Sequence, residues 1–112
     1  MSLRGRNAED AALRFLQARG LRLIERNYRC RFGEIDLVMR DAAQIVFVEV
    51  RMRSSTRVGG ASESITAGKR SRLLTAARHF MSAHHDLPAC RFDAVLLDGD
   101  TRIEWVRNAF GE

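Results

Sequence analysis

Two neighbouring β-type segments in the first half of the chain carry acidic side chains at alternating positions. Because side chains of a strand alternate between its two faces, Glu34 and Asp36 share one face of the first segment, and Glu49 and Arg51 share one face of the second. Carboxylates that meet about 5 Å apart across two strands repel each other unless a cation lies between them. Oxygen ligands of this kind suit Mg²⁺ or Mn²⁺, so the pattern points to metal-dependent chemistry.

The register of the two segments decides whether these carboxylates meet. A two-residue turn at 42–43 places Asp36 directly opposite Glu49, and Glu34 directly opposite Arg51. This turn lacks the Gly or Asn that short hairpins favour, and a longer loop with a bulge would shift the pairing. The alternative is an exposed hairpin with an ordinary ion pair between Glu34 and Arg51. Apolar side chains on the same face favour a covered site, in which carboxylates need partners.

Two expected helices each present one charged residue within an apolar arc. Glu9 lies between Leu13 and Leu16 on the wheel of the first helix, and Lys69 lies one turn before Leu73 in the second. The simpler alternatives are a rim glutamate paired with an arginine, and a lysine whose stem covers apolar surface.

A common convergence point explains both placements, because carboxylates, a divalent metal ion and one or two cations form a phosphodiester-hydrolysing site. The candidate metal ligands are Glu9, Asp36 and Glu49. The candidate catalytic residues are Glu9, Asp36, Glu49, Arg51 and Lys69.

The elements that must position these residues follow from the pattern along the chain. We expect an α/β fold in one domain, residues 1–112, with a mixed five-stranded sheet flanked by helices. Asn7 caps a first helix that runs to about Arg19 and ends at Gly20, and Ser62 or Ser64 caps a second helix that runs to about His84. The strands are expected at 21–28, 34–39, 45–51, 91–97 and 101–106. The first three suit an antiparallel meander, and the helical connection suits a parallel pairing of the third and fourth.

Charge and composition narrow the class of partner. The chain has 112 residues, 46% of them hydrophobic, and a net charge of +5 in which Lys69 is the single lysine beside eighteen arginines. Arginine matches phosphate geometry, although its abundance can also follow from the composition of the source genome. The expected nucleic-acid contacts are Arg53, Arg57, Arg70 and Arg72.

Localisation is expected to be cytoplasmic. No apolar run reaches the ~18 residues of a membrane helix, and the first residues contain no apolar export segment. Cys30 and Cys90 form no metal-binding or redox motif and are expected to be free thiols.

The motifs of these two strands resemble those of the YraN family of small bacterial proteins. That family is assigned to the restriction-endonuclease-like, or PD-(D/E)xK, superfamily, which also includes the archaeal Holliday-junction resolvases. The likeness rests on Gly33-Glu-Ile-Asp-Leu-Val38 followed by Val46-Phe-Val-Glu-Val-Arg51 and Arg53. It extends to Gly5–Glu9, Arg26–Arg29, Lys69–Leu73, Arg91–Asp93 and Trp105–Phe110.

The resemblance implies an αβββαβ core and a metal-dependent, resolvase-like DNA endonuclease that uses Mg²⁺ or Mn²⁺, with branched DNA as the favoured substrate and a possible homodimer. By similarity, Asp36 and Glu49 take the two acidic motif positions, and Glu9 corresponds to the first-helix glutamate of resolvase-like members. Arg51 stands where the superfamily usually has lysine, and arginine cannot exchange a proton with water. Either Arg51 clamps phosphate, or Lys69 supplies the lysine from the helix. The alternatives are a nucleic-acid-binding module without turnover and a protein-interaction adaptor.

Overall fold

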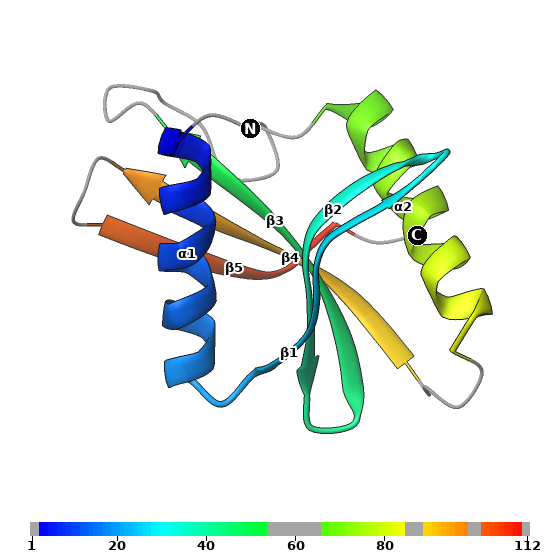
Figure 1. Cartoon of the computed structure of the whole chain (residues 1–112), viewed down its shortest axis with the longest axis horizontal. Helices are drawn as coiled ribbons and strands as arrows, with labels where there is room; N and C mark the ends of the chain where they lie inside the picture. Colours follow the sequence, from blue (N-terminus) through cyan, green and yellow to red (C-terminus); the bar gives the residue numbers. More distant parts are fainter. Residues whose placement is uncertain (1–2, 54–65, 85–88, 99–101, 111–112) are drawn as a thin grey trace.

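The computed structural model describes residues 3–53, 66–84, 89–98 and 102–110, and these form two helices and five strands (Figure 1). In chain order the elements are α1 (Leu3–Ala18), β1 (Arg22–Cys30), β2 (Gly33–Asp41), β3 (Gln44–Arg53), α2 (Ala67–Ser82), β4 (Ala89–Asp98) and β5 (Arg102–Phe110). The order and the α/β class are those expected from the sequence.

The strands form one mixed sheet whose spatial order follows the chain, β1-β2-β3-β4-β5. The pairs β1/β2, β2/β3 and β4/β5 are antiparallel, and β3/β4 is parallel. The parallel pair requires a crossover connection, and α2 lies within it, as the helix-length spacing indicated. This arrangement leaves β3 in the centre of the sheet, where its residues are shielded on both faces.

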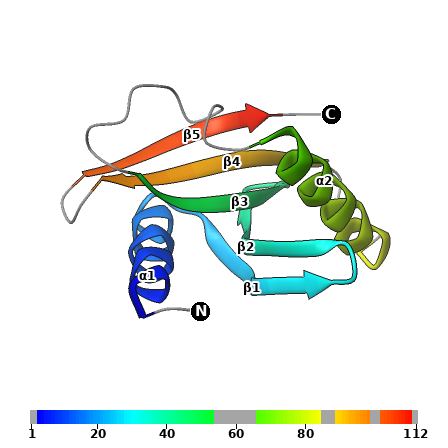
Figure 2. The same cartoon turned by 90° about the horizontal axis from the view of Figure 1, so that it is seen from above.

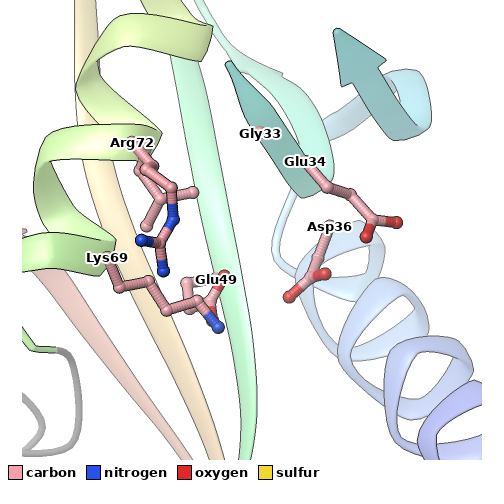
Figure 3. A pocket seen from close by; sticks show the side chains of 7 residues that line it. Gly33, Glu34, Asp36, Glu49, Lys69 and Arg72 are labelled. Carbon is pink, nitrogen blue, oxygen red and sulfur yellow. The ribbon is translucent and has the colours of Figure 1, made fainter. Parts of the chain in front are cut away.

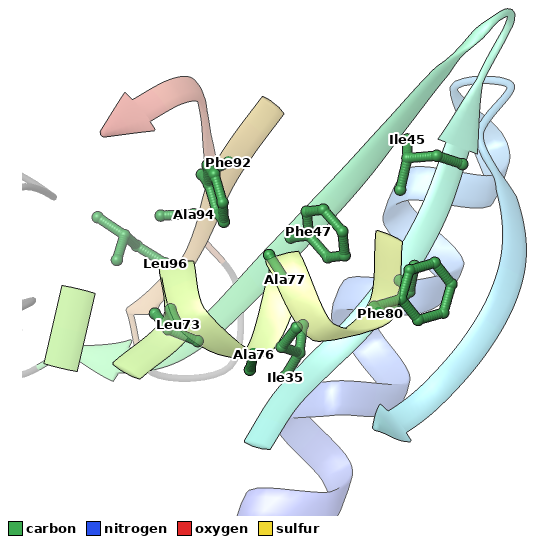
Figure 4. Close-up of a cluster of buried hydrophobic side chains, with 11 residues drawn as sticks. Ile35, Ile45, Phe47, Leu73, Ala76, Ala77, Phe80, Phe92, Ala94 and Leu96 are labelled. Atoms are coloured by element: carbon green, nitrogen blue, oxygen red, sulfur yellow. The ribbon is translucent and has the colours of Figure 1, made fainter. Parts of the chain in front are cut away.

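Each face of the sheet packs against one helix (Figure 2). On β3, Ile45 and Phe47 belong to the cluster with α2, whereas Val46 and Val48 belong to the cluster with α1. This alternation is the two-residue period of a strand buried on both sides. The larger cluster surrounds Phe80 and is drawn in Figure 4.

The β2–β3 hairpin has the predicted register. Pairing runs from Asp41↔Gln44, beside the turn, to Leu37↔Val48. Ala42 adopts a φ of 55°, which is the left-handed conformation that tight turns require, although alanine is not favoured there. The residues of this turn gave only a weak signal, and the apolar faces of the two strands set the register instead.

The alternation expected for β2 is wrong at its first residues. Ile35 packs in the α2 cluster with Val38, whereas Leu37 packs on the α1 side. Asn27, which lies opposite Asp36 in the β1–β2 register, has a φ of 55°. The β1 backbone is therefore irregular at the same level of the sheet as the change of face in β2.

Several expected helix and strand ends need correction. Asn7 lies inside α1 and does not cap it, because the helix already begins at Leu3. Gly20 does end α1, with a φ of 95° and hydrogen bonds from Gly20 N to Gln17 O and from Leu21 N to Leu16 O.

The second helix begins later than expected. Thr66 caps α2 and accepts a hydrogen bond from Lys69 N at 3.2 Å, whereas the expected caps Ser62 and Ser64 lie outside the described residues. The fifth strand runs four residues further than predicted, to Phe110, because a second left-handed residue, Asn108, lets the strand continue through an irregular pairing with β4.

Candidate active site

Asp36 and Glu49 lie together where β2 and β3 cease to pair. The ladder of paired residues ends at Leu37↔Val48, and the Asp36 carboxylate accepts a hydrogen bond from Val50 N at 2.9 Å. Glu49 is only 3% exposed. A buried carboxylate is costly without partners, so this end of the hairpin concentrates unfavourable negative charge.

The environment of Asp36 raises its pKa from the usual 3.8 to about 7. Burial is the largest cause, and the charge of Glu49 is the second; the hydrogen bond from Val50 N opposes both, and the charge of Glu9 adds to the rise. The Asp36 carboxyl is therefore partly protonated near neutral pH.

Two cations approach Glu49 from different elements. The Lys69 ammonium, from the first turn of α2, lies 2.6 Å from Glu49 Oε2, and Arg51 Nη1 lies 3.5 Å from the same oxygen. The Lys69 stem therefore crosses the apolar arc of its helix and brings its charge to the carboxylate. Either Arg51 or Lys69 could supply the basic group of the site, and Lys69 makes the shorter contact with Glu49.

Asp36, Glu49 and Lys69 line a pocket of about 160 Å³ between the start of β2 and the start of α2. Figure 3 shows Lys69 and Arg72 extending from α2 towards Glu49, with Asp36 facing them from β2. The lining residues are Gly33, Glu34, Asp36, Glu49, Lys69, Arg72 and Leu73. The pocket therefore joins three carboxylates and two cations in a small, largely polar space.

Glu9 is buried, as its place in the apolar arc predicted, with 4% exposure. It pairs with Arg26, whose Nε lies 3.3 Å from Glu9 Oε1 and whose Nη2 lies 2.5 Å from Asp10 Oδ1. Glu9 is thus a buried glutamate paired with an arginine, close enough to influence the pKa of Asp36 but absent from the lining of the pocket.

Sequence reasoning did not assign a role to Arg26. Its position on an exposed strand carries no signal of a contact with α1, because the sequence separation of 17 residues is bridged only in the folded chain.

Glu34 has a different partner from the one considered in the sequence. It pairs with Arg29 of β1 at 3.2 Å, where the cross-strand register places the two residues opposite each other, and not with Arg51. Both side chains are well exposed, so this ion pair contributes little to stability.

The four arginines expected to contact nucleic acid are distributed unevenly. Arg72 lines the pocket, and Arg70 lies on the same turn of α2. Arg53 ends β3, and Arg57 lies outside the described residues. Their contacts with nucleic acid remain a prediction.

The donor chemistry of the pocket fits a divalent cation. Within the described part of the chain, no three His, Cys, Asp or Glu side chains form a ready-made metal cage. Mg²⁺, however, is commonly held by one or two carboxylates together with waters and substrate phosphates. Asp36 and Glu49 provide two such carboxylates. The pKa of Asp36 is raised first by burial and then by the charge of Glu49, and a bound cation would oppose both effects. Glu9 as a third ligand remains a prediction and would require release from Arg26.

Two further expectations concern the rest of the chain. Neither described helix combines the length and apolar character needed to cross a bilayer. Cys30 and Cys90 are both free thiols.

Comparison with known proteins gives a family. The model of "Uncharacterised protein family UPF0102" matches residues 8–97, which include both carboxylates and Lys69. A UPF0102 protein of Nitrosomonas europaea is 59% identical over 111 residues, covering 97% of this chain and 94% of the relative. A UPF0102 protein of Ralstonia nicotianae is 60% identical over 112 residues, covering 96% and 85%. A UPF0102 protein of Methylobacillus flagellatus is 57% identical over 109 residues, covering 95% of each.

Proposed function

We propose that this protein, which belongs to the UPF0102 (YraN) family, is a metal-dependent endonuclease that hydrolyses phosphodiester bonds of DNA. One observation carries the proposal: Asp36 and Glu49 share a small pocket with the Lys69 ammonium, 2.6 Å from Glu49. Two acids, a lysine and a divalent ion are the groups that phosphodiester hydrolysis needs at one point.

The residues of the chain divide this work between them. Asp36 and Glu49 would hold a Mg²⁺ or Mn²⁺ ion, which supplies charge neutralisation and water activation when bound. Asp36 must lose its proton to act as a ligand, so the ion competes with the proton for the same carboxylate. Lys69, anchored by Glu49, places a positive charge beside the carboxylates, where it can orient a water molecule or a phosphate oxygen.

Arg72 extends the positive charge to the outer side of the pocket. It is an exposed residue of the same helix and lines the pocket with Lys69. Arginine forks bind phosphate oxygens in pairs, so Arg72 suits the DNA backbone next to the reacting phosphate. The net charge of +5 favours the approach of any such polyanion.

A cleavage assay with matched variants tests the proposal. A labelled four-way junction, plain duplex and single strand are incubated with EDTA, Mg²⁺ or Mn²⁺, using the wild type and Asp36→Asn. We expect metal-dependent nicking by the wild type and a loss of at least about a hundredfold in the variant, with DNA binding retained or strengthened. Cleavage that survives in Asp36→Asn would contradict the assignment.

The other outcomes point to the alternative functions. Salt-sensitive DNA binding without cleavage in any metal would indicate a nucleic-acid-binding module. If the protein neither binds nor cleaves DNA, a protein partner with an acidic surface becomes the favoured alternative.

A further inference from the structure

The turn of the β1–β2 hairpin carries an exposed aromatic side chain beside α2. Phe32 is the second of two turn residues and is 36% exposed. Its ring centroid lies 5.8 Å from that of His79 of α2, and the guanidinium carbon of Arg31 lies 5.2 Å from it. We call Tyr28, Phe32 and His79 the turn patch. A two-residue turn favours small or polar residues, so turn formation itself does not require phenylalanine.

The turn patch is fixed to the core of the protein. The Tyr28 hydroxyl and His79 Nδ1 are hydrogen-bonded at 2.5 Å. The Tyr28 ring packs edge-on against the buried Phe80, with centroids 5.2 Å apart. The His79 ring that Phe32 contacts is therefore anchored to the core through Tyr28, while part of the Phe32 ring stays exposed to solvent.

The turn patch lies beside the candidate active site. Phe32 directly precedes Gly33, which lines the pocket and lies against Arg72: a β-carbon at Gly33 would be 3.6 Å from the Arg72 Cβ. From Phe32 to Asp36 is about 13 Å along β2, and from Lys69 to His79 is about 15 Å along α2. Figure 1 shows the hairpin turn next to α2. At ~3.4 Å per nucleotide along a strand, the patch lies about four nucleotides from the carboxylate pair.

We propose that the turn patch binds an unpaired nucleobase of the substrate, which stacks on Phe32 while the backbone runs past Arg72 to the pocket. This inference rests on the proposed function and narrows its substrate to nucleic acid with unpaired nucleotides near the cleaved bond. A base inside a duplex exposes only its edges, whereas an unpaired base offers the face of its ring to an aromatic side chain.

The surrounding charge favours a nucleic acid over a protein as the occupant. Arg31 lies in the turn itself, Arg72 of α2 lies against Gly33, and both Arg72 and Arg78 are exposed residues of α2. Aromatic side chains among arginines are the usual composition of surfaces that bind single-stranded nucleic acid.

Binding of DNA in EDTA tests this inference without any cleavage. The probes are a duplex with a short central unpaired loop that contains 2-aminopurine and the same duplex fully paired. We expect the wild type to bind the looped DNA about tenfold more tightly and to quench the 2-aminopurine fluorescence. Phe32→Leu keeps an apolar side chain against His79 but removes the ring, and we expect it to lose the preference and the quenching.

Two control variants sharpen the comparison. Phe32→Trp retains a ring and should keep the preference. Leu23→Ala alters a side chain of similar exposure (38%) on the same hairpin and should also keep it. Far-UV circular dichroism and thermal unfolding establish that each variant is folded.

The outcomes separate this inference from the proposed function. A preference for the looped DNA that survives in Phe32→Leu, or that the wild type lacks, overturns the inference even if the protein cleaves DNA. A preference lost in Phe32→Leu supports it even if no cleavage is found. A change in the sedimentation of Phe32→Leu with unaltered DNA binding would assign the patch to a protein contact and would likewise overturn it.

Discussion

Asp36 is an acid whose ionised form the folded protein destabilises. Its pKa near 7, caused first by burial and then by the charge of Glu49, places its titration in the physiological range. The symmetric turn was sufficient to predict the β2–β3 register that brings Asp36 and Glu49 close together, although the alternation expected for β2 was not kept. The same reasoning could not predict that Glu9 pairs with Arg26, because that contact depends on how α1 lies across the sheet.

Replacing Asp36 by asparagine should stabilise the metal-free protein at alkaline pH. Below the unfolded pKa both states hold the proton; between about pH 4 and pH 7 only the folded state does, so stability falls as pH rises through this window. The full difference above pH 7 is about 4 kcal/mol. We expect Asp36→Asn to exceed the wild type by up to that amount at pH 8, with a smaller gap at pH 5, in urea unfolding with EDTA.

The control for this prediction is Glu34→Gln, which removes an exposed carboxylate of the same strand and is unfolded under the same conditions. If the difference in free energy of unfolding between Asp36→Asn and the wild type stays constant from pH 5 to pH 8, the ionised Asp36 carboxylate is not destabilised by its surroundings.

Lys69 should matter more to turnover than Arg51. Its ammonium lies 2.6 Å from Glu49 Oε2, against 3.5 Å for Arg51. We expect Lys69→Met to lower the single-turnover cleavage rate about a hundredfold and Arg51→Met to lower it less than tenfold. A larger loss in Arg51→Met, with Lys69→Met close to the wild type, would give the basic role to the strand residue.

At the scale of the elements, the sequence predicted the type and order of the described helices and strands, and it failed at the start of α2, the cap of α1 and the end of β5. The apolar alternation of β3 and the Gly20 signal were strong, because each reflects a local rule. The change of face in β2 was not visible, and neither was the left-handed conformation of Asn27 at the same level of the neighbouring strand. Such conformations depend on pairing partners that the sequence does not show.

A buried acid on β4 joins the last two strands, and its loss should be expensive. Asp93 is fully buried and accepts hydrogen bonds from Arg91 Nε at 3.0 Å, Trp105 Nε1 at 2.9 Å and Asn108 N at 2.9 Å. Asp93→Ala leaves Arg91 without this partner and should reduce the free energy of unfolding by about 3–5 kcal/mol.

The matched comparison is Glu34→Ala, which removes the exposed ion pair with Arg29 and should cost less than about 1 kcal/mol in the same urea titration. Equal losses in the two variants would indicate that the Asp93 network does not connect β4 and β5 as described.

At the scale of the whole molecule, the two helices on opposite faces of the sheet are expected to differ in their role. The pocket opens beside α2, whose Lys69 and Arg72 line it, whereas α1 contributes the buried Glu9. The net charge of +5 and the abundance of arginine in the sequence indicated a polyanionic partner. The sequence could not show that Arg72 belongs to the pocket, since that follows from its turn of α2 lying against Gly33.

DNA affinity should fall linearly with salt on logarithmic axes, and one cation of α2 should account for a measurable part of the slope. We expect Arg72→Gln to reduce the slope by about 1, because it removes one phosphate contact. Arg14→Gln, an exposed arginine of α1, should leave the slope unchanged. Fluorescence anisotropy between ~50 and ~300 mM NaCl measures both. Equal slopes for Arg72→Gln and the wild type would place the bound DNA elsewhere on the surface.

The measurement that tests the central claim most directly is calorimetric titration of the wild type and Asp36→Asn with Mn²⁺. With an Asp36 pKa of about 7, an ion that binds this carboxylate must displace its proton at pH 6.5, whereas little proton remains to displace at pH 8.5. We predict one Mn²⁺ site, a release of roughly 0.8 proton at pH 6.5 that nearly disappears at pH 8.5, and loss of the site in Asp36→Asn. Binding that is equal in the variant, or that releases no proton at pH 6.5, would contradict the assignment of Asp36 and Glu49 as a metal site.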